Sequence, residues 1–139
     1  MTRLLDINVL LALAWPQHIH HVRVNRWILL QKTRAEISVA TCPITQLGFV
    51  RISMNLKGYA ADFQSAIGLL DHFVNRKEFR HSFWEDDLTV SSLGRQVKFE
   101  PGPNQLTDVY LAGLAESRQG TFTTLDAGVK SQSAELIPE

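Results

Sequence analysis

Near its amino end the chain reads TRLLDINVLLALAW (residues 2–15), an apolar run that one acidic residue, Asp6, interrupts. Residues 2–6 have the length and composition of a short strand, and apolar residues at helical spacing begin directly after them. We predict that Asn8 caps this helix and that Pro16 ends it. An unpaired carboxylate inside such a run is costly. Asp6 is therefore the first residue in the sequence for which we expect a function.

The rest of the chain alternates helical and extended patterns, with short breaks between them. Apolar residues at helical spacing predict further helices at 20–34, with Val22, Trp27 and Leu30 on the apolar face, and at 43–54, 60–76 and 105–117. Apolar, β-branched and aromatic runs predict strands at 36–40, 81–84, 96–100, 121–124 and 134–137. Strands separated by helices form βαβ units. We therefore predict a single α/β domain, residues 1–139, with a mostly parallel sheet covered on both faces.

Composition narrows the class of protein. With 139 residues, 45% of them hydrophobic and 20% charged, the chain has the balance of an ordinary folded domain. Its formal net charge is zero, which argues against a protein that coats nucleic acid without specificity. The charges are uneven, however. Residues 1–61 contain seven Lys and Arg and two Asp and Glu, whereas the remainder contains seven Lys and Arg and twelve Asp and Glu. A local basic surface that contacts phosphate is therefore still compatible with the sequence.

Cysteine content and hydropathy bear on cofactors and location. Cys42 is the only cysteine, which excludes an internal disulfide and a cysteine-rich zinc site. The apolar run 9–15 is much shorter than the roughly 20 residues that a membrane span needs. No secretion signal is recognised. We therefore expect a cytoplasmic protein.

Three acids from distant parts of the chain are predicted to meet at one edge of the sheet. Asp6 ends the first strand, Asp126 follows the strand 121–124, and Asp108 lies in the first turn of the helix after a Pro-Gly-Pro loop. Ligands of open parallel sheets collect beyond the carboxyl ends of the strands. A divalent cation would relieve the repulsion between three carboxylates and would support phosphodiester hydrolysis. Asp108 and Asp126 also have structural explanations, as a helix-end charge and a turn residue.

The residues around these acids resemble the motifs of PIN-domain ribonucleases, and most closely those of VapC-type toxins of bacterial type II toxin–antitoxin systems. Four segments in the family's order carry the resemblance: LLDINVLL at 4–11, ITQLGFVR at 44–51, LTDVYLAGLA at 106–115 and TTLDAGV at 123–129. The resemblance implies a PIN-like three-layer α/β/α sandwich and a Mg²⁺-dependent endoribonuclease, with Mn²⁺ as the alternative metal. It also implies an RNA substrate, a cognate antitoxin protein and self-association, for which a homodimer is the default.

Within this resemblance, Asp6, Asp108 and Asp126 carry over as the catalytic residues and metal ligands. The family usually has Glu where this chain has Gln46. An amide can orient a water molecule but supplies no negative charge. We therefore expect one well-bound ion at a site of three carboxylates, and weaker binding of a second.

Three further residues are expected to support the site. Asn8 and Thr124 are predicted to hold the carboxylates in place, as residues behind metal ligands commonly do. Arg51, five positions after Gln46 on the same helix, is a candidate for reaching this edge of the sheet and binding substrate phosphate. A surface ion pair is the alternative for Arg51.

Two other functions stay open. The missing fourth acid at Gln46 is compatible with a catalytically weakened module that binds RNA or protein without cutting. A phosphoacceptor domain of the receiver type also has acids at strand ends. However, Asp6 lacks the acidic neighbour that receivers need, and Lys130 lies only four residues after Asp126.

Overall fold

The computed structural model describes residues 1–32, 36–55, 57 and 59–139. In this part of the chain, five strands form one sheet in the order β3-β2-β1-β4-β5, and every neighbouring pair is parallel. The strands are β1 (Arg3–Leu5), β2 (Ile37–Thr41), β3 (Phe79–Phe83), β4 (Thr121–Thr124) and β5 (Ala134–Leu136). The helices are α1 (Ile7–Ala14), α2 (His21–Lys32), α3 (Pro43–Met54), α4 (Phe63–Val74), α5 (Val90–Gln96) and α6 (Leu106–Ser117), the last preceded by a 3-10 turn at Pro103–Gln105.

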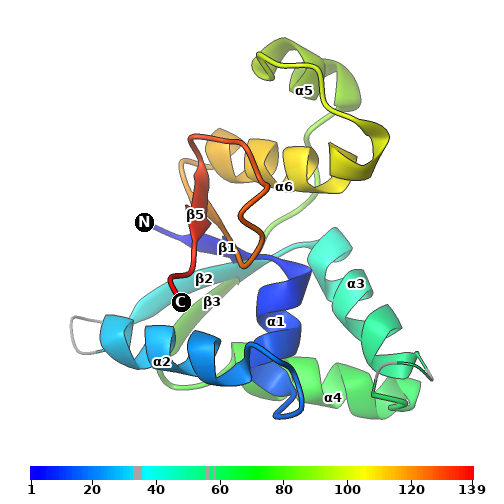
Figure 1. The fold of residues 1–139 in the computed structure, drawn as a ribbon, viewed down its shortest axis with the longest axis vertical. Coiled ribbons are helices and arrows are strands. Elements are labelled where there is room, and N and C mark those ends of the chain that lie inside the picture. Colours follow the sequence, from blue (N-terminus) through cyan, green and yellow to red (C-terminus); the bar gives the residue numbers. More distant parts are fainter. Residues whose placement is uncertain (33–35, 56, 58) are drawn as a thin grey trace.

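Helices cover both faces of the sheet (Figure 1). Helices α1 to α4 lie on one face, and α6 lies on the other with α5 beyond it. The central strand β1 contributes to both cores, because Leu5 packs with α1 to α4 and Leu4 packs with α6. Both of these residues are leucines, as expected for a parallel strand that is buried on both faces. The predicted three-layer α/β/α fold is confirmed.

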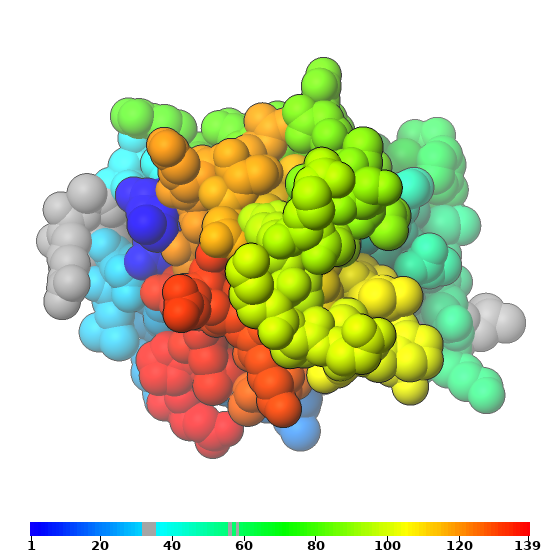
Figure 2. Space-filling view, turned by 90° about the horizontal axis from the view of Figure 1, so that it is seen from above, coloured from blue at the N-terminus to red at the C-terminus, as the bar shows by residue number. Residues whose placement is uncertain are grey.

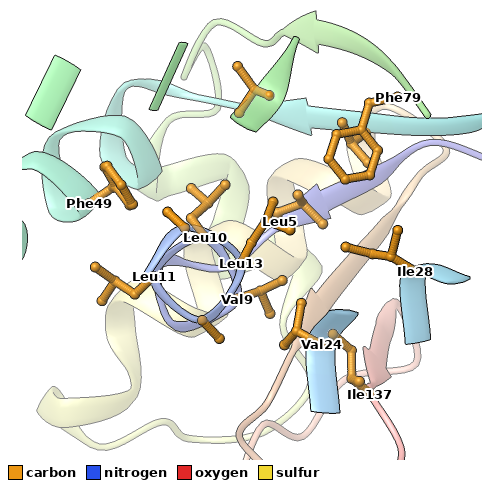
Figure 3. Packing of buried hydrophobic residues seen from close by; sticks show 14 of the residues in the cluster. Leu5, Val9, Leu10, Leu11, Leu13, Val24, Ile28, Phe49, Phe79 and Ile137 are labelled. Carbon is orange, nitrogen blue, oxygen red and sulfur yellow. The ribbon is translucent and has the colours of Figure 1, made fainter. Parts of the chain in front are cut away.

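Helix α1 is the centre of the larger core. All its residues from Val9 to Ala14 are buried. Figure 3 shows this helix end-on, surrounded by Leu5 of β1, Val24 of α2 and Phe49 of α3. An eight-residue helix is not stable alone in water, so α1 depends on this packing. Among the described residues, no helix is both long enough and apolar enough to cross a membrane.

The cap of α1 differs from the prediction. Asp6, rather than Asn8, is the N-cap residue, and its carboxylate accepts a hydrogen bond from the backbone N–H of Ile7 at 2.7 Å. No loop separates β1 from α1, so the residue that ends the strand also caps the helix. Asn8 therefore lies inside the first turn. The helix ends at Ala14, just before Pro16, as the sequence predicts.

The predicted strand at 96–100 is wrong. Helix α5 extends to Gln96, and the residues after it belong to no strand. Thr89 caps this helix, because its hydroxyl accepts a hydrogen bond from the backbone N–H of Ser92 at 3.1 Å. Thr89, a favoured N-cap residue, is the signal in the sequence that points to this helix. The strand predicted at 81–84 does form, although it begins earlier, as β3.

The apolar face predicted for the second helix is also wrong in part. Val22 and Leu30 are 66% and 60% exposed, whereas Trp27 is buried. The face in contact with the core contains Val24, Trp27 and Ile28, which have the i, i+3, i+4 spacing of a helix face. The end of the predicted helix, at 33–34, lies outside the described residues.

Candidate functional site

The carboxyl ends of β1 and β4 meet at one edge of the sheet, because the two strands are parallel and Leu5 pairs with Thr123. Asp6 directly follows β1, and Asp126 follows β4 after one intervening residue. Asp108 lies in the first turn of α6. We call these three acids the acidic rim. The structure brings them close enough that the charges of Asp108 and Asp126 both act on Asp6.

Asp6 is the most buried acid of the rim, with 6% of its surface exposed. Burial raises the pKa of its carboxyl to about 6, and the negative charges of Asp108 and Asp126 contribute to the increase. Hydrogen bonds from the Thr124 hydroxyl and the Ile7 N–H favour the ionised carboxylate, and they therefore limit the increase in the pKa of Asp6. The pKa of Asp108 is also raised, by its partial burial and by Asp126. In the described residues, no Lys or Arg forms an ion pair with the rim.

Thr124 connects two of the three acids. Its hydroxyl donates a hydrogen bond to Asp6 Oδ2 at 2.6 Å and accepts one from the backbone N–H of Asp126 at 3.0 Å. Asp126 is exposed and forms a turn, in which its Oδ1 accepts a hydrogen bond from the N–H of Gly128 at 2.8 Å. Asn8 Oδ1 accepts a longer hydrogen bond, 3.4 Å, from the backbone after β4. Thr124 and Asn8 therefore join α1 to the loop that carries Asp126.

Gln46 lies near the start of α3, which begins directly after β2 at the same edge of the sheet. Its amide Nε2 donates a hydrogen bond to Thr41 Oγ1 at 3.0 Å, and this oxygen lies 2.7 Å from His81 Nε2 on β3. Burial lowers the pKa of His81, although the charge of Asp71 opposes this effect. In the described residues, Gln46 is thus bonded to a buried neutral hydroxyl and to none of the rim acids.

Thr41 and His81 were not identified from the sequence. Alternation along a strand places Thr41 on the same face of β2 as the buried Val39, so the sequence does indicate that the Thr41 side chain is buried. The contact with His81 also depends on the pairing of β2 with β3, in which His81 lies opposite Val39. Residues on separate strands cannot be paired from a single sequence.

Comparison with known proteins identifies the family. Ribonuclease VapC38 of Mycobacterium tuberculosis is 42% identical over 130 residues, which cover 91% of this chain and 86% of that protein. The chain belongs to the VapC ribonuclease family. Ribonuclease VapC39 of the same species is 37% identical over 140 residues, covering 99% of this chain and 98% of that protein. The predicted resemblance to VapC-type toxins is therefore confirmed.

A solved structure supports the fold of this VapC chain. The crystal structure of VapBC2 from Rickettsia felis bound to a DNA fragment from their promoter matches with a TM-score of 0.65. The match covers 98% of both chains at 14% sequence identity, so it bears on the fold alone. No protein-family model matches this VapC chain.

The three acids of the rim have the chemical type of ligand that a hard divalent cation prefers. Carboxylate oxygens with no cationic partner in the described residues are the type of ligand that Mg²⁺ prefers. Within the same residues, however, no group of three His, Cys, Asp or Glu side chains is placed so that it could hold a metal ion. In this arrangement, an ion at the rim would have fewer than three of these side chains as ligands and would keep most of its water ligands, as Mg²⁺ commonly does.

Arg51 does not lie at the rim. Helix α3 starts at the sheet edge and runs away from it, and Arg51 is in its last turn (Figure 1). There it lines a surface groove of about 430 Å³ between α3 and α4, together with Leu47, Met54 and Phe63. The hypothesis that Arg51 contacts substrate phosphate beside the acids has no support in this arrangement.

Proposed function

We propose that this VapC chain is a divalent-metal-dependent endoribonuclease that acts as the toxin of a toxin–antitoxin pair. The observation that carries the proposal is the convergence of Asp6, Asp108 and Asp126, with a pKa of about 6 at the buried Asp6. Perturbed pKa values in a group of converging acids are typical of functional sites. Relatives that cover nearly the whole chain are named ribonucleases, which supports RNA as the substrate.

The three aspartates would hold Mg²⁺, or Mn²⁺ in its place, as metal ligands and catalytic residues. When bound, the ion supplies charge neutralisation and a more acidic water molecule. Asp6 is oriented by the Ile7 N–H and the Thr124 hydroxyl, and the same hydroxyl fixes the backbone of Asp126. In the proposed reaction, a water molecule gives up one proton as its oxygen attacks the phosphorus in line. The bond from phosphorus to the 3′ oxygen breaks, and the 3′ oxygen takes up one proton, so the number of protons balances. The products carry a 5′ phosphate and a 3′ hydroxyl.

We also propose a cognate antitoxin as the protein partner. The solved structure of similar fold is a complex named VapBC2, which supports a partner of this kind. The antitoxin would inhibit cleavage by laying a helix or an extended segment over the acidic rim. A homodimer and a cytoplasmic location complete the proposal, because two-fold dimers are the commonest oligomers and the substrate is cellular RNA.

RNA cleavage by purified protein tests the proposed activity. The wild-type protein should cleave structured RNA in the presence of Mg²⁺ and should not cleave it when EDTA removes the metal. Asp108→Asn should slow cleavage at least about 100-fold, because a charged ligand becomes neutral and metal catalysis contributes several kcal/mol. Asp71→Asn, an exposed acid on α4, is the matched control and should cleave like wild type. Equal cleavage by wild type and Asp108→Asn would falsify the proposal.

A second candidate function follows from Gln46. Its amide donates to Thr41, so the site lacks the charge that a carboxylate would supply there. This observation favours a weakened module that binds RNA or protein without cutting.

Gln46→Glu separates the two candidates. If the wild type is a ribonuclease, the variant should cleave at Mg²⁺ concentrations several-fold lower, because a fourth negative charge near the rim strengthens cation binding. The measurement is the Mg²⁺ dependence of the cleavage rate, with Gln46→Ala as the control that removes the amide without adding charge. Cleavage by Gln46→Glu alone, with an inactive wild type, would establish the binding module instead.

A further inference from the structure

A groove extends away from the acidic rim on the α6 side of the sheet. Its main cavity, about 560 Å³, lies between α6, the segment after α5 and the loop that connects β4 to β5. Phe99, Val109 and Lys130 line this cavity and also line a small pocket of about 20 Å³ that contains Asp108. The groove is therefore continuous with the rim. Figure 2 shows its two outer walls, the yellow-green segment after α5 and the orange-red loop, lying beside each other.

The α5 wall of the groove is anchored to α6. The side chain of Leu93 lies so close to Gly113 that a Cβ at that glycine would be 2.6 Å from Leu93 Cδ1. Gln96 Nε2 donates to the carbonyl of Gly113 at 3.3 Å and to Glu116 Oε2 at 2.7 Å. These contacts anchor the start of the following segment, in which Val97, Lys98 and Phe99 line the groove. A cavity of this size lies within the range of roughly 300–1,000 Å³ that is common for ligand sites.

The lining combines cations, hydroxyls and one exposed aromatic ring. Lys98 and Lys130 come from opposite walls, both are exposed, and neither forms an ion pair in the described residues. Ser131 and Ser133 add hydroxyl groups, and Phe99 is 40% exposed. The lining also contains one acidic residue, Glu116, whose carboxylate accepts a hydrogen bond from the Gln96 amide. Proteins that bind single-stranded nucleic acid commonly have a groove with cationic side chains that contact the phosphate backbone and an aromatic ring on which a base stacks.

We propose that this groove binds the single-stranded RNA segment next to the bond that is cut. Lys98 and Lys130 contact its phosphates, and the ring of Phe99 stacks on one base. The acids of the rim repel an approaching phosphate, and the two lysines offset this repulsion on the side from which the strand enters. This inference rests on the proposed function, because it takes the rim as the place where RNA is cut.

Binding without cleavage tests the groove. A short, fluorescein-labelled single-stranded RNA is titrated with protein in EDTA, and anisotropy is measured over a series of salt concentrations. Lys98→Ala/Lys130→Ala should weaken binding about tenfold at low salt. It should also reduce the slope of log K against log salt by about 1.4, which corresponds to two lost phosphate contacts on a single strand. Phe99→Ala should weaken binding about tenfold without changing the slope, and Phe99→Leu should behave in the same way.

Lys77→Ala is the matched control. Lys77 is exposed just before β3, which is the outermost strand on the side of the sheet away from β4 and β5. Its loss should therefore change neither the affinity for RNA nor the salt slope. The proposal is overturned if the double lysine variant binds RNA with the affinity and slope of wild type. Cleavage in Mg²⁺ is measured separately. A wild type that binds RNA through the lysines but does not cleave would overturn the proposed nuclease and leave the groove supported.

Discussion

Asp6→Asn is expected to abolish RNA cleavage and, at the same time, to make the metal-free protein more stable at pH 7. The loss of cleavage should be at least about 100-fold, because the variant lacks a charged ligand at the most buried position of the rim. The gain in the free energy of unfolding should be up to about 3 kcal/mol. It arises because an ionised Asp6, 6% exposed and near two other acids, is unfavourable when no cation is bound.

The direction of this effect follows from the raised pKa. Burial and the neighbouring acids raise the pKa of Asp6 from 3.8 to about 6, so the folded protein holds this proton more tightly than the unfolded chain does. The resulting stabilisation is complete below about pH 4 and is lost as the pH rises through 6. In EDTA, wild type should therefore lose stability over this pH range, and Asp6→Asn should lose much less. Asparagine can still accept the hydrogen bond from the Ile7 N–H.

Chemical denaturation in EDTA at pH 4 and pH 7 measures this difference. Asp71→Asn, which changes an exposed acid, should follow wild type at both pH values. Added Mg²⁺ should stabilise wild type by mass action and should stabilise Asp6→Asn much less. If Asp6→Asn is no more stable than wild type in EDTA at pH 7, the carboxylate is not unfavourable in the metal-free fold, and the metal site is placed in doubt.

Phe49→Ala is expected to have the largest effect on folding, lowering the free energy of unfolding by roughly 3–5 kcal/mol. Phe49 is 0% exposed and packs against the core around α1 (Figure 3). Removing its ring leaves a cavity between α3 and the centre of the larger core. Because domains of this size are stable by only about 5–15 kcal/mol, the loss is a large fraction of the total.

Phe63→Ala provides the matched control. The same ring is removed, but Phe63 is 53% exposed at the start of α4, so the loss should be less than about 1 kcal/mol. Urea denaturation followed by tryptophan fluorescence measures both variants. Similar midpoints for the two variants would show that α3 is not held to α1 through Phe49.

Much of the fold could be predicted from the sequence because its signals are local. The apolar run around Asp6 predicted a short strand followed directly by a helix, and both form. The alternation of strands and helices predicted a parallel sheet with two covered faces. The predictions failed where two local signals competed. Residues 96–100 have apolar residues suited to a strand, but the Thr89 cap and the packing against α6 favour the helix before them.

The site was predictable in its acids and less so in its supporting residues. Asp6 and Asp126 were located by the rule that parallel strands end at one edge. Asn8 was predicted as a cap, whereas the structure assigns that position to Asp6. Thr124 was predicted next to the acids, but its double role, donating to Asp6 and accepting from Asp126, depends on how β1 and β4 are paired.

By itself, therefore, the sequence determined the fold class, most of the order of the elements and the placement of the three acids at strand and helix ends, because periodicity and strand ends are read along the chain. Only the tertiary structure decided what surrounds them. It buried Asp6 and raised its pKa, bonded Gln46 to Thr41 and placed Lys98 opposite Lys130 across one groove. These properties arise from distances between residues far apart in the chain. Burial, charge interaction and hydrogen bonding depend on those distances, and no local pattern encodes them.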